Sequence, residues 1–188
     1  MLSPLSRALC CALSFAVVPA AAAQSAAGGL FDHQLRRLHA DEVVDLAVRY
    51  AGHPVLIVNT ASHCGYTGQF GELEAVYREY RERGLKVAGF PSDDFRQEAR
   101  DEAETAQVCF VNFGVTFDMY APVAVRGDAA HPLFRELARQ SEAPRWNFHK
   151  YVVDRNGRVV AAFPSRVKPD APAVRAAIEA ALGGAPAR

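Results

Sequence analysis

A single cysteine stands where two expected elements meet, and its surroundings suit a nucleophile. Cys64 follows residues 55–59, a β-branched run typical of a buried strand, and precedes a helical pattern that starts near Phe70. Free backbone N–H groups and the positive end of the helix dipole at such a junction favour the thiolate form of cysteine. Thr67 is expected to cap the helix. The alternative is an inert cysteine packed at the end of a strand.

The residue three positions after Cys64 is Thr67 and not a second cysteine. The loop therefore lacks the adjacent pair of thiols that a disulfide oxidoreductase uses. A lone activated thiolate indicates nucleophilic chemistry.

The surrounding pattern predicts one α/β domain that positions this cysteine. A hairpin is expected over residues 35–46, strands over 55–59 and 86–90, and helices over 70–80, 101–113, 132–140 and 171–182; residues 148–163 should form a hairpin around Asn156-Gly157, and 115–127 should be irregular. Gly84 and Gly114 are expected to end the first two helices. Strand, helix, strand and then a hairpin with a last helix give a mixed sheet flanked by helices, the thioredoxin-like arrangement.

The composition is that of one globular domain with no charge bias. The chain has 188 residues, half of them hydrophobic, and 21 basic residues balance 21 acidic ones. No net field therefore points to nucleic acid or to an anionic membrane surface as a partner.

The first residues have the pattern of a secretory signal. Arg7 precedes an apolar run over residues 8–18, and small residues fill positions 20–23. The run is shorter than the roughly 20 residues that span a bilayer. We expect cleavage after Ala23, leaving an exported, periplasmic domain at 24–188. That domain keeps only Cys64 and Cys109, too few for a disulfide-stapled scaffold.

Four stretches in this order resemble the motifs of the glutathione peroxidase family: residues 55–67 (VLIVNTASHCGYT), 89–98 (GFPSDDFRQE), 112–117 (NFGVTF) and 146–150 (WNFHK). The resemblance covers residues 30–182. It implies a thioredoxin-like fold and a peroxidase active in the response to oxidative stress, which reduces hydrogen peroxide and organic or lipid hydroperoxides.

The resemblance also implies the site residues. Cys64 takes the place of the residue that attacks the peroxide and becomes a sulfenic acid. Gln97, Trp146 and Asn147 complete the family's tetrad as hydrogen-bond donors. The residues alone leave other interpretations open: Trp146 as a core anchor, Asn147 as a turn former and Gln97 as a solvated loop residue. The second motif departs from the family pattern, because it is one residue shorter before Gln97 and lacks a glycine there.

Cys109 aligns with the resolving cysteine of the thioredoxin-dependent members. This implies a Cys64–Cys109 disulfide that a thioredoxin-like dithiol protein reopens. Since Cys109 falls within an expected helix, that helix would have to unwind locally. One alternative is that Cys109 is a buried structural residue and that the protein is a one-cysteine peroxidase that uses glutathione. A second alternative is that the protein is a non-catalytic exported binding module.

No cofactor or metal is expected. His63 adjoins Cys64, but no other ligands stand at zinc spacing, and a protonated His63 could instead assist thiolate formation. The short segment between Met119 and Trp146 resembles family members that lack the insertion used to build tetramers, so we expect a monomer or weak dimer with an open site.

Overall fold

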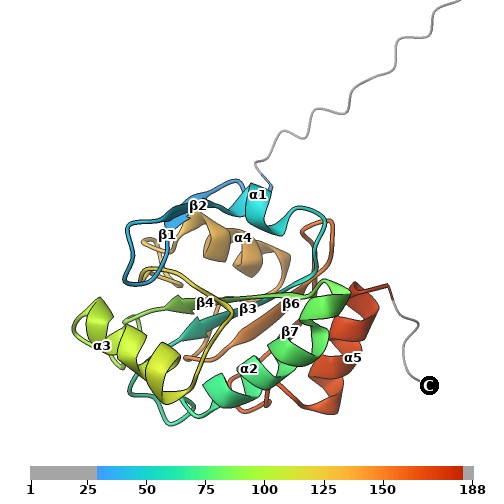
Figure 1. Ribbon diagram of the computed structural model, residues 1–188. Coiled ribbons are helices and arrows are strands. Elements are labelled where there is room, and N and C mark those ends of the chain that lie inside the picture. Colours follow the sequence, from blue (N-terminus) through green and yellow to red (C-terminus); the bar gives the residue numbers. More distant parts are fainter. Residues whose placement is uncertain (1–28, 184–188) are drawn as a thin grey trace, which may run out of the picture.

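The computed structural model describes residues 29–183, so the predicted signal peptide lies outside the described part of the chain. The elements follow in the order β1 (Gln34–Arg36), β2 (Val43–Asp45), α1 (Leu46–Tyr50), β3 (Val55–Thr60), α2 (Gln69–Tyr80), β4 (Lys86–Pro91), α3 (Glu102–Ala106), β5 (Asp118–Met119), α4 (Pro132–Gln140), β6 (Lys150–Val153), β7 (Val159–Phe163) and α5 (Pro172–Ala181) (Figure 1). A 3-10 helix, Arg81–Arg83, extends α2, and a π-helix, Gln107–Asn112, continues α3.

Five strands form one mixed sheet in the order β5-β4-β3-β6-β7. Strand β4 runs parallel to both β3 and β5, whereas β6 pairs antiparallel with β3 and with β7. At the centre of the sheet, Ile57 lies between Ala88 of β4 and Tyr151 of β6. Parallel neighbours need a crossover connection, which α2 provides between β3 and β4. The mixed sheet and the thioredoxin-like fold are confirmed.

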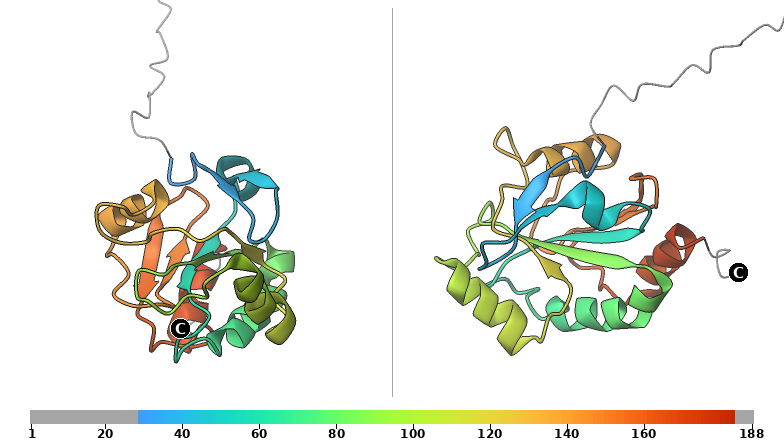
Figure 2. Two further views of the ribbon diagram at one scale, coloured as in Figure 1. Left: turned by 90° about the vertical axis from the view of Figure 1, so that its left-hand side faces the viewer. Right: turned by 45° about the horizontal axis from the view of Figure 1, so that its top comes forward.

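Helices cover both faces of the sheet. Helices α2 and α5 lie on one face, while α1, α4 and the β1–β2 hairpin lie on the other (Figures 1 and 2). Side chains alternate along β3, so Leu56 and Val58 join the core under α2 and α5, and Val55 and Ile57 join the opposite core. Because β3 is buried on both faces, its sequence is a continuous apolar run.

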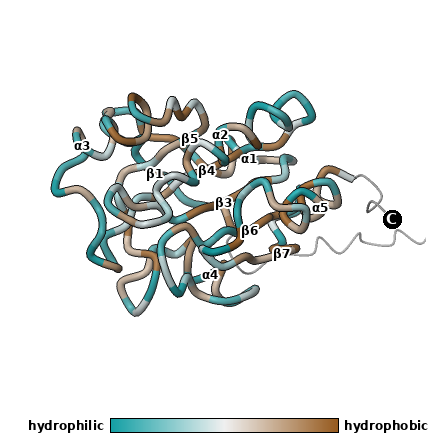
Figure 3. The backbone as a smooth tube through the Cα atoms, turned by 90° about the horizontal axis from the view of Figure 1, so that it is seen from below, coloured by the Kyte–Doolittle hydropathy of each residue, from teal (hydrophilic) through white to brown (hydrophobic). Residues whose placement is uncertain are grey.

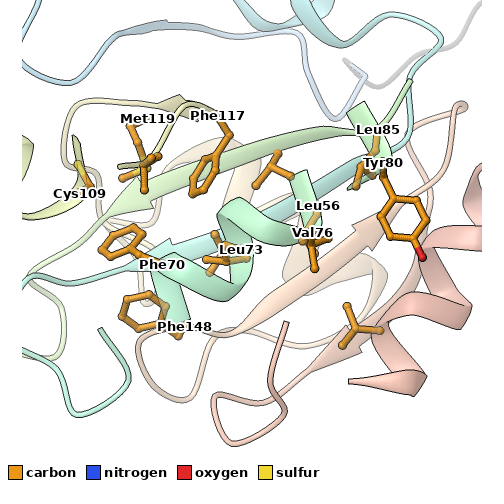
Figure 4. Packing of buried hydrophobic residues seen from close by; sticks show 14 of the residues in the cluster. Leu56, Phe70, Leu73, Val76, Tyr80, Leu85, Cys109, Phe117, Met119 and Phe148 are labelled. Carbon is orange, nitrogen blue, oxygen red and sulfur yellow. The ribbon is translucent and has the colours of Figure 1, made fainter. Parts of the chain in front are cut away.

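The core between the sheet and α2 holds the segment that follows Cys64 in place. Figure 4 shows Phe70, Leu73 and Val76 of α2 beside Leu56 of β3, with Phe148 next to Phe70. The rings of Phe70 and Phe148 meet edge to face with centroids 5.3 Å apart. In Figure 3 the stretches with the hydrophobic colour include β3 and β6. No helix within residues 29–183 is long and apolar enough to cross a membrane.

The predicted elements are present, and the differences concern short or irregular segments. Gly84 has a φ of 99° and Gly157 a φ of 77°, as expected for a helix stop and a tight hairpin turn. Helix α1 was not predicted, and the segment predicted as irregular contains the two-residue strand β5. The helix predicted to run to residue 113 stays an α-helix only to Ala106 and continues as the π-helix.

Candidate active site

The loop after β3 holds Cys64 through Thr67 and Tyr66. Thr67 Oγ1 accepts a hydrogen bond from the Cys64 N–H (3.1 Å) and lies 2.9 Å from the Ala61 carbonyl oxygen, to which it can donate. The Tyr66 N–H points at Cys64 Sγ (3.4 Å). The prediction that Thr67 caps α2 is wrong: Gly68 is the N-cap residue, and the Thr67 hydroxyl closes the cysteine loop instead. Cys64 is 8 % exposed, so most of its surface is covered by neighbouring residues.

Gln97 lies beside this loop, although the motif that contains it is one residue shorter than the pattern it resembles. The His63 N–H donates to the Gln97 carbonyl oxygen at 2.9 Å, which joins the two loops one residue before Cys64. Arg96 turns the chain with a φ of 57°, a left-handed conformation that is uncommon for a residue with a side chain. Gln97 Oε1 accepts from Asn147 Nδ2 at 3.1 Å, which leaves the Gln97 Nε2 donors for another acceptor.

The turn that contains Trp146 and Asn147 is held against β3 by hydrogen bonds with the backbone and the side chain of Asn59. The Phe148 N–H donates to the Asn59 carbonyl (2.6 Å), and Asn59 Nδ2 donates to the Trp146 carbonyl (3.2 Å). Asn147 is fully buried, and its Oδ1 has no hydrogen-bond partner among residues 29–183. Trp146 is 41 % exposed, so it is not the core anchor that the residues alone allowed.

A cavity of about 340 Å³ connects Trp146 to the cysteine loop, because Tyr66 and Trp146 both line it; the other lining residues are Arg145, His149, Pro164, Ser165 and Arg166. Phe95 supports the indole from the other side, with ring centroids 5.2 Å apart. The structure thus joins Asn147 to Gln97, joins Gln97 to the Cys64 loop, and places Trp146 on a cavity that Tyr66 also lines. No group of three His, Cys, Asp or Glu residues in the described chain is placed to hold a metal ion.

Cys109, the second cysteine, is enclosed in the core and is not in a disulfide. It lies in the π-helix with no exposed surface, and its Sγ donates to the Thr105 carbonyl at 3.1 Å. Burial raises the pKa of the Cys109 thiol to about 12, so the residue is a neutral thiol in this state. Figure 4 shows Cys109 at the edge of the core cluster, beside Met119. The same cluster includes Cys64.

The glutathione peroxidase family profile matches residues 30–138, more than half of the chain. The chain belongs to the glutathione peroxidase family. It is therefore a thiol-dependent peroxidase. The glutathione peroxidase of Lactococcus lactis is 39% identical over 127 residues, which are 64% of this chain and 81% of that protein. The glutathione peroxidase homolog BsaA of Bacillus subtilis is 42% identical over 127 residues, 64% of this chain and 79% of that protein.

Solved structures agree with this assignment. The crystal structure of T. cruzi GPX1 superimposes with a TM-score of 0.62 and 28% identity, covering 83% of this chain and 97% of that one. Trp146 and Asn147 lie beyond the residues that the family profile matches. The hydrogen bond from Asn147 to Gln97 and the place of Trp146 on the cavity that Tyr66 lines are therefore independent structural observations.

Glu98 fastens the helix that carries the second cysteine of this peroxidase to the Cys64 loop. Its Oε1 accepts from the Ser62 hydroxyl and from Thr105 Oγ1 (3.0 Å). His63 Nε2 lies 3.2 Å from Glu104 Oε1, a second link between the same two segments. Sequence reasoning missed Glu98, although its position directly after Gln97 was a signal.

Lys150 was also missed, and it supports the turn that presents Trp146 and Asn147. The Lys150 ammonium is fully buried and donates to Gln69 Oε1 (2.8 Å) and to the Phe148 carbonyl (2.6 Å). Burial lowers the pKa of Lys150 to about 7. Phe148 has a φ of 61°, so this linkage stabilises a left-handed turn. The available signal was a lysine at the start of an apolar strand.

The buried His149 predicts a loss of stability of this peroxidase in mild acid. Burial lowers the pKa of His149 from 6.5 to about 4, and Glu142, 3.9 Å away, offsets this only in part. Between these pH values the unfolded chain binds a proton that the folded chain excludes, so the free energy of unfolding should fall as the pH drops from 6.5 to 4. The loss should be on the order of 3 kcal/mol.

Urea unfolding at a series of pH values measures this dependence. His149→Gln should flatten the curve between pH 6.5 and 4, whereas Asn156→Ala, which changes an exposed side chain that does not titrate, should leave the wild-type slope. Equal slopes for wild type and His149→Gln would contradict the prediction.

Proposed function

We propose that the protein reduces hydroperoxides through Cys64 and a second step at Cys109. In the first step the Cys64 thiolate attacks the terminal peroxide oxygen. An S–O bond forms, the O–O bond breaks, and the alcohol or water leaves after taking a proton, so that sulfur is oxidised to a sulfenic acid. The Asn147–Gln97 hydrogen bond carries this proposal, because it orients two amides on loops bonded to the cysteine segment.

The donors have distinct positions. The Gln97 Nε2 group is free of the bond to Asn147, and Trp146, whose indole carries an N–H donor, lines the cavity that Tyr66 also lines. Such donors can stabilise the negative charge on the departing oxygen. Their effect depends on being held in place, which the contacts of Asn59 and Lys150 support.

In the second step the Cys109 thiol loses its proton and attacks the Cys64 sulfenic sulfur, which releases water and forms an intramolecular disulfide. Cys109 must first leave the core. The π-helix around it supports local opening, because Phe110 is 38% and Val111 67% exposed, and these residues therefore contribute little packing. A thioredoxin-like dithiol protein then reduces the disulfide by exchange.

A one-cysteine cycle with glutathione as reductant is the second candidate. The burial of Cys109 and its raised pKa favour it, because the closed state offers no nucleophile to the sulfenic acid. In that cycle one glutathione thiol would form a mixed disulfide with Cys64 and a second would release it.

The site is consistent with hydrogen peroxide and organic or lipid hydroperoxides as substrates. We further propose that the protein works as a monomer or weak dimer in the periplasm, after cleavage near Ala23. The signal-like pattern of residues 1–23 is the support for this location.

Mass spectrometry after one equivalent of hydroperoxide separates the two cycles. The reduced wild-type protein should lose both thiols and show a Cys64–Cys109 linkage, and Cys109→Ser should hold a sulfenic acid at Cys64 that a dimedone probe traps. A trapped sulfenic acid in both proteins would establish the one-cysteine cycle. No oxidation of Cys64 in either protein would overturn the proposal.

A further inference from the structure

The Glu98 side chain lies between the two segments that carry the cysteines and is hydrogen-bonded to both. Its Oε1 accepts from the Ser62 hydroxyl in the Cys64 loop and from Thr105 Oγ1 in α3 (3.0 Å). The Ala99 N–H donates to the same oxygen at 2.7 Å. Glu98, Ser62 and Thr105 therefore form a latch that fixes α3 against the Cys64 loop.

Water has little access to this latch. Ser62 is 9% exposed and Thr105 is 3% exposed. Glu98 Oε2 is also buried and has no hydrogen-bond partner within residues 29–183. Hydrogen bonds to an ionised carboxylate are stronger than those between neutral groups, and a buried carboxylate that loses its donors is strongly disfavoured. A movement of α3 relative to the Cys64 loop therefore has to overcome these bonds.

Thr105 connects the latch to the second cysteine. Its hydroxyl is bonded to Glu98, and its carbonyl oxygen accepts from Cys109 Sγ at 3.1 Å, one helical turn further along the chain. The α-helical part of this segment ends at Ala106, and the π-helix that contains Cys109 begins directly after it. Release of Thr105 from Glu98 therefore loosens the turn that keeps Cys109 in the core.

The closed latch keeps Cys109 away from Cys64. Neither cysteine is in a disulfide, and Cys109 has no exposed surface. A disulfide requires two Cα atoms within about 7 Å of each other, but the Glu98 carboxylate stands between the two segments. Burial raises the pKa of the Cys109 thiol, and the charge of Glu98 raises it further. The closed latch therefore withholds both the approach and the thiolate that disulfide formation needs.

We propose that this latch decides which thiol reacts with the Cys64 sulfenic acid. While the latch is closed, a small external thiol such as glutathione attacks the sulfur, so that a mixed disulfide forms, the S–O bond breaks and water leaves. When Thr105 leaves Glu98, the Cys109 thiolate attacks the same sulfur instead. The S–O bond again breaks, and the departing hydroxide takes up a proton, which gives an internal disulfide and water. The inference rests on the proposed reaction at Cys64 and adds a control of its second step.

Four variants test the latch without changing a residue assigned to peroxide reduction. Thr105→Val keeps the shape of threonine but has no hydroxyl, and Thr105→Ser, which keeps the hydroxyl, is its matched control. Thr105→Val also loses a bond to the Asp101 carbonyl (3.2 Å), which Ser62→Ala leaves in place. Glu104→Gln changes only the second link between the segments, the pair with His63, whose side chains are 47% and 54% exposed.

Acid-quenched flow with mass spectrometry measures both steps in the full-length reduced protein after one equivalent of hydrogen peroxide. Loss of the free Cys64 thiol gives the rate of the first step, and the Cys64–Cys109 linkage gives the rate of the second. A parallel series with excess glutathione measures the share of Cys64 that is first captured as a mixed disulfide. Urea unfolding shows whether each variant is folded, and Ser62→Ala breaks the same latch if Thr105→Val does not fold.

Thr105→Val and Ser62→Ala should each speed the second step about tenfold, because each removes one hydrogen bond to the carboxylate. The share of mixed disulfide should fall accordingly, and the first step should keep its wild-type rate. Thr105→Ser should keep the wild-type rates of both steps. Glu104→Gln should change the second step by less than about twofold, since exposed ion pairs contribute little.

An unchanged or slower second step in the folded latch variants would overturn the inference, and so would an equal increase in Thr105→Ser, because the hydroxyl would then not matter. If Cys64 is oxidised but no disulfide forms in any of these proteins, the latch is not what withholds Cys109, and the one-cysteine cycle stands. A Cys64 that hydrogen peroxide never oxidises would instead refute the proposed function.

Discussion

Replacement of Asn147 by alanine should slow the oxidation of Cys64 by hydrogen peroxide roughly 100-fold. Asn147 has no exposed surface, and its Nδ2 donates to Gln97 Oε1. That bond decides which end of the Gln97 amide is free, so alanine at 147 removes one amide and releases the other. Because an amide donor helps only when it is already oriented, both effects raise the barrier of the same step.

Stopped-flow single-turnover oxidation at pH 7 measures this rate without a contribution from the reductant. Gln97→Ala and the double variant complete a double-mutant cycle. If the two amides act as a unit, the double variant should be hardly slower than either single variant. Asn156→Ala, at an exposed asparagine in the β6–β7 turn, is the control.

The buried position raises the concern that Asn147→Ala unfolds the protein. Urea unfolding of each variant tests this concern. The oxidation rates can be compared as long as nearly all of each protein is folded under the assay conditions. A folded Asn147→Ala protein that reacts at the wild-type rate would show that Asn147 only shapes the turn.

Residue patterns were sufficient for the parts of the fold with long, regular elements. Strand β3 is apolar at successive positions because both of its faces are buried, and α2 shows helical spacing because one face packs on the sheet. The turn at Asn156-Gly157 was predictable for a local reason, the positive φ that Gly157 adopts. Each of these signals depends on neighbours in sequence.

The parts that were missed depend on distant contacts. Helix α1 has five residues and β5 has two, both too short for a periodicity. The π-helix at Cys109 is built from residue types that also occur in an α-helix, so the sequence pattern cannot distinguish a π-helix from an α-helix. Thr67 was assigned to the helix it precedes, while its hydroxyl bonds backward to the cysteine loop.

For the site, the motif resemblance named Gln97, Trp146 and Asn147 as candidates, but only contacts between distant segments show how Gln97 and Asn147 meet. Arg96, directly before Gln97, has a left-handed backbone, and Gln97 accepts a hydrogen bond from Asn147. That outcome depends on the pairing of Gln97 with a loop fifty residues away. Lys150 and Glu98 were missed for a similar reason, because their partners lie in other segments.

Replacement of Asp118 by asparagine should lower the free energy of unfolding by about 3 kcal/mol, the largest stability effect that we expect of one polar substitution here. Asp118 accepts from Arg37 Nη1 (2.8 Å), Arg49 Nε (2.7 Å) and the Tyr50 hydroxyl (3.2 Å). Burial acts to raise the pKa of Asp118, but the bonds from Arg49 and Arg37 outweigh it and hold the pKa below its usual range.

The size of the effect follows from what the substitution leaves behind. Asparagine has the shape of aspartate but no charge, so Arg49 loses its counter-ion and Arg37 keeps only the exposed Glu42, whose Oε2 lies 2.9 Å from Arg37 Nε. The side chains of Arg37 and Arg49 are 27% and 34% exposed, and water therefore compensates part of the loss, which places the cost at the low end for a buried pair. Asp118 lies on β5, Arg37 follows β1 and Arg49 belongs to α1, so the network joins the β1–β2 layer to the sheet edge.

Urea denaturation at pH 7 measures the change, with Asp128→Asn, at an exposed aspartate, as the control. The advantage of wild type over Asp118→Asn should be full above pH 4 and should shrink as the pH falls through the lowered pKa of Asp118, since protonation then removes the same charge. A loss below 1 kcal/mol at pH 7, or one that does not depend on pH, would contradict this account. The β1–β2 layer would then be held mainly by apolar contacts such as that between Phe31 and Tyr50, whose ring centroids are 5.1 Å apart.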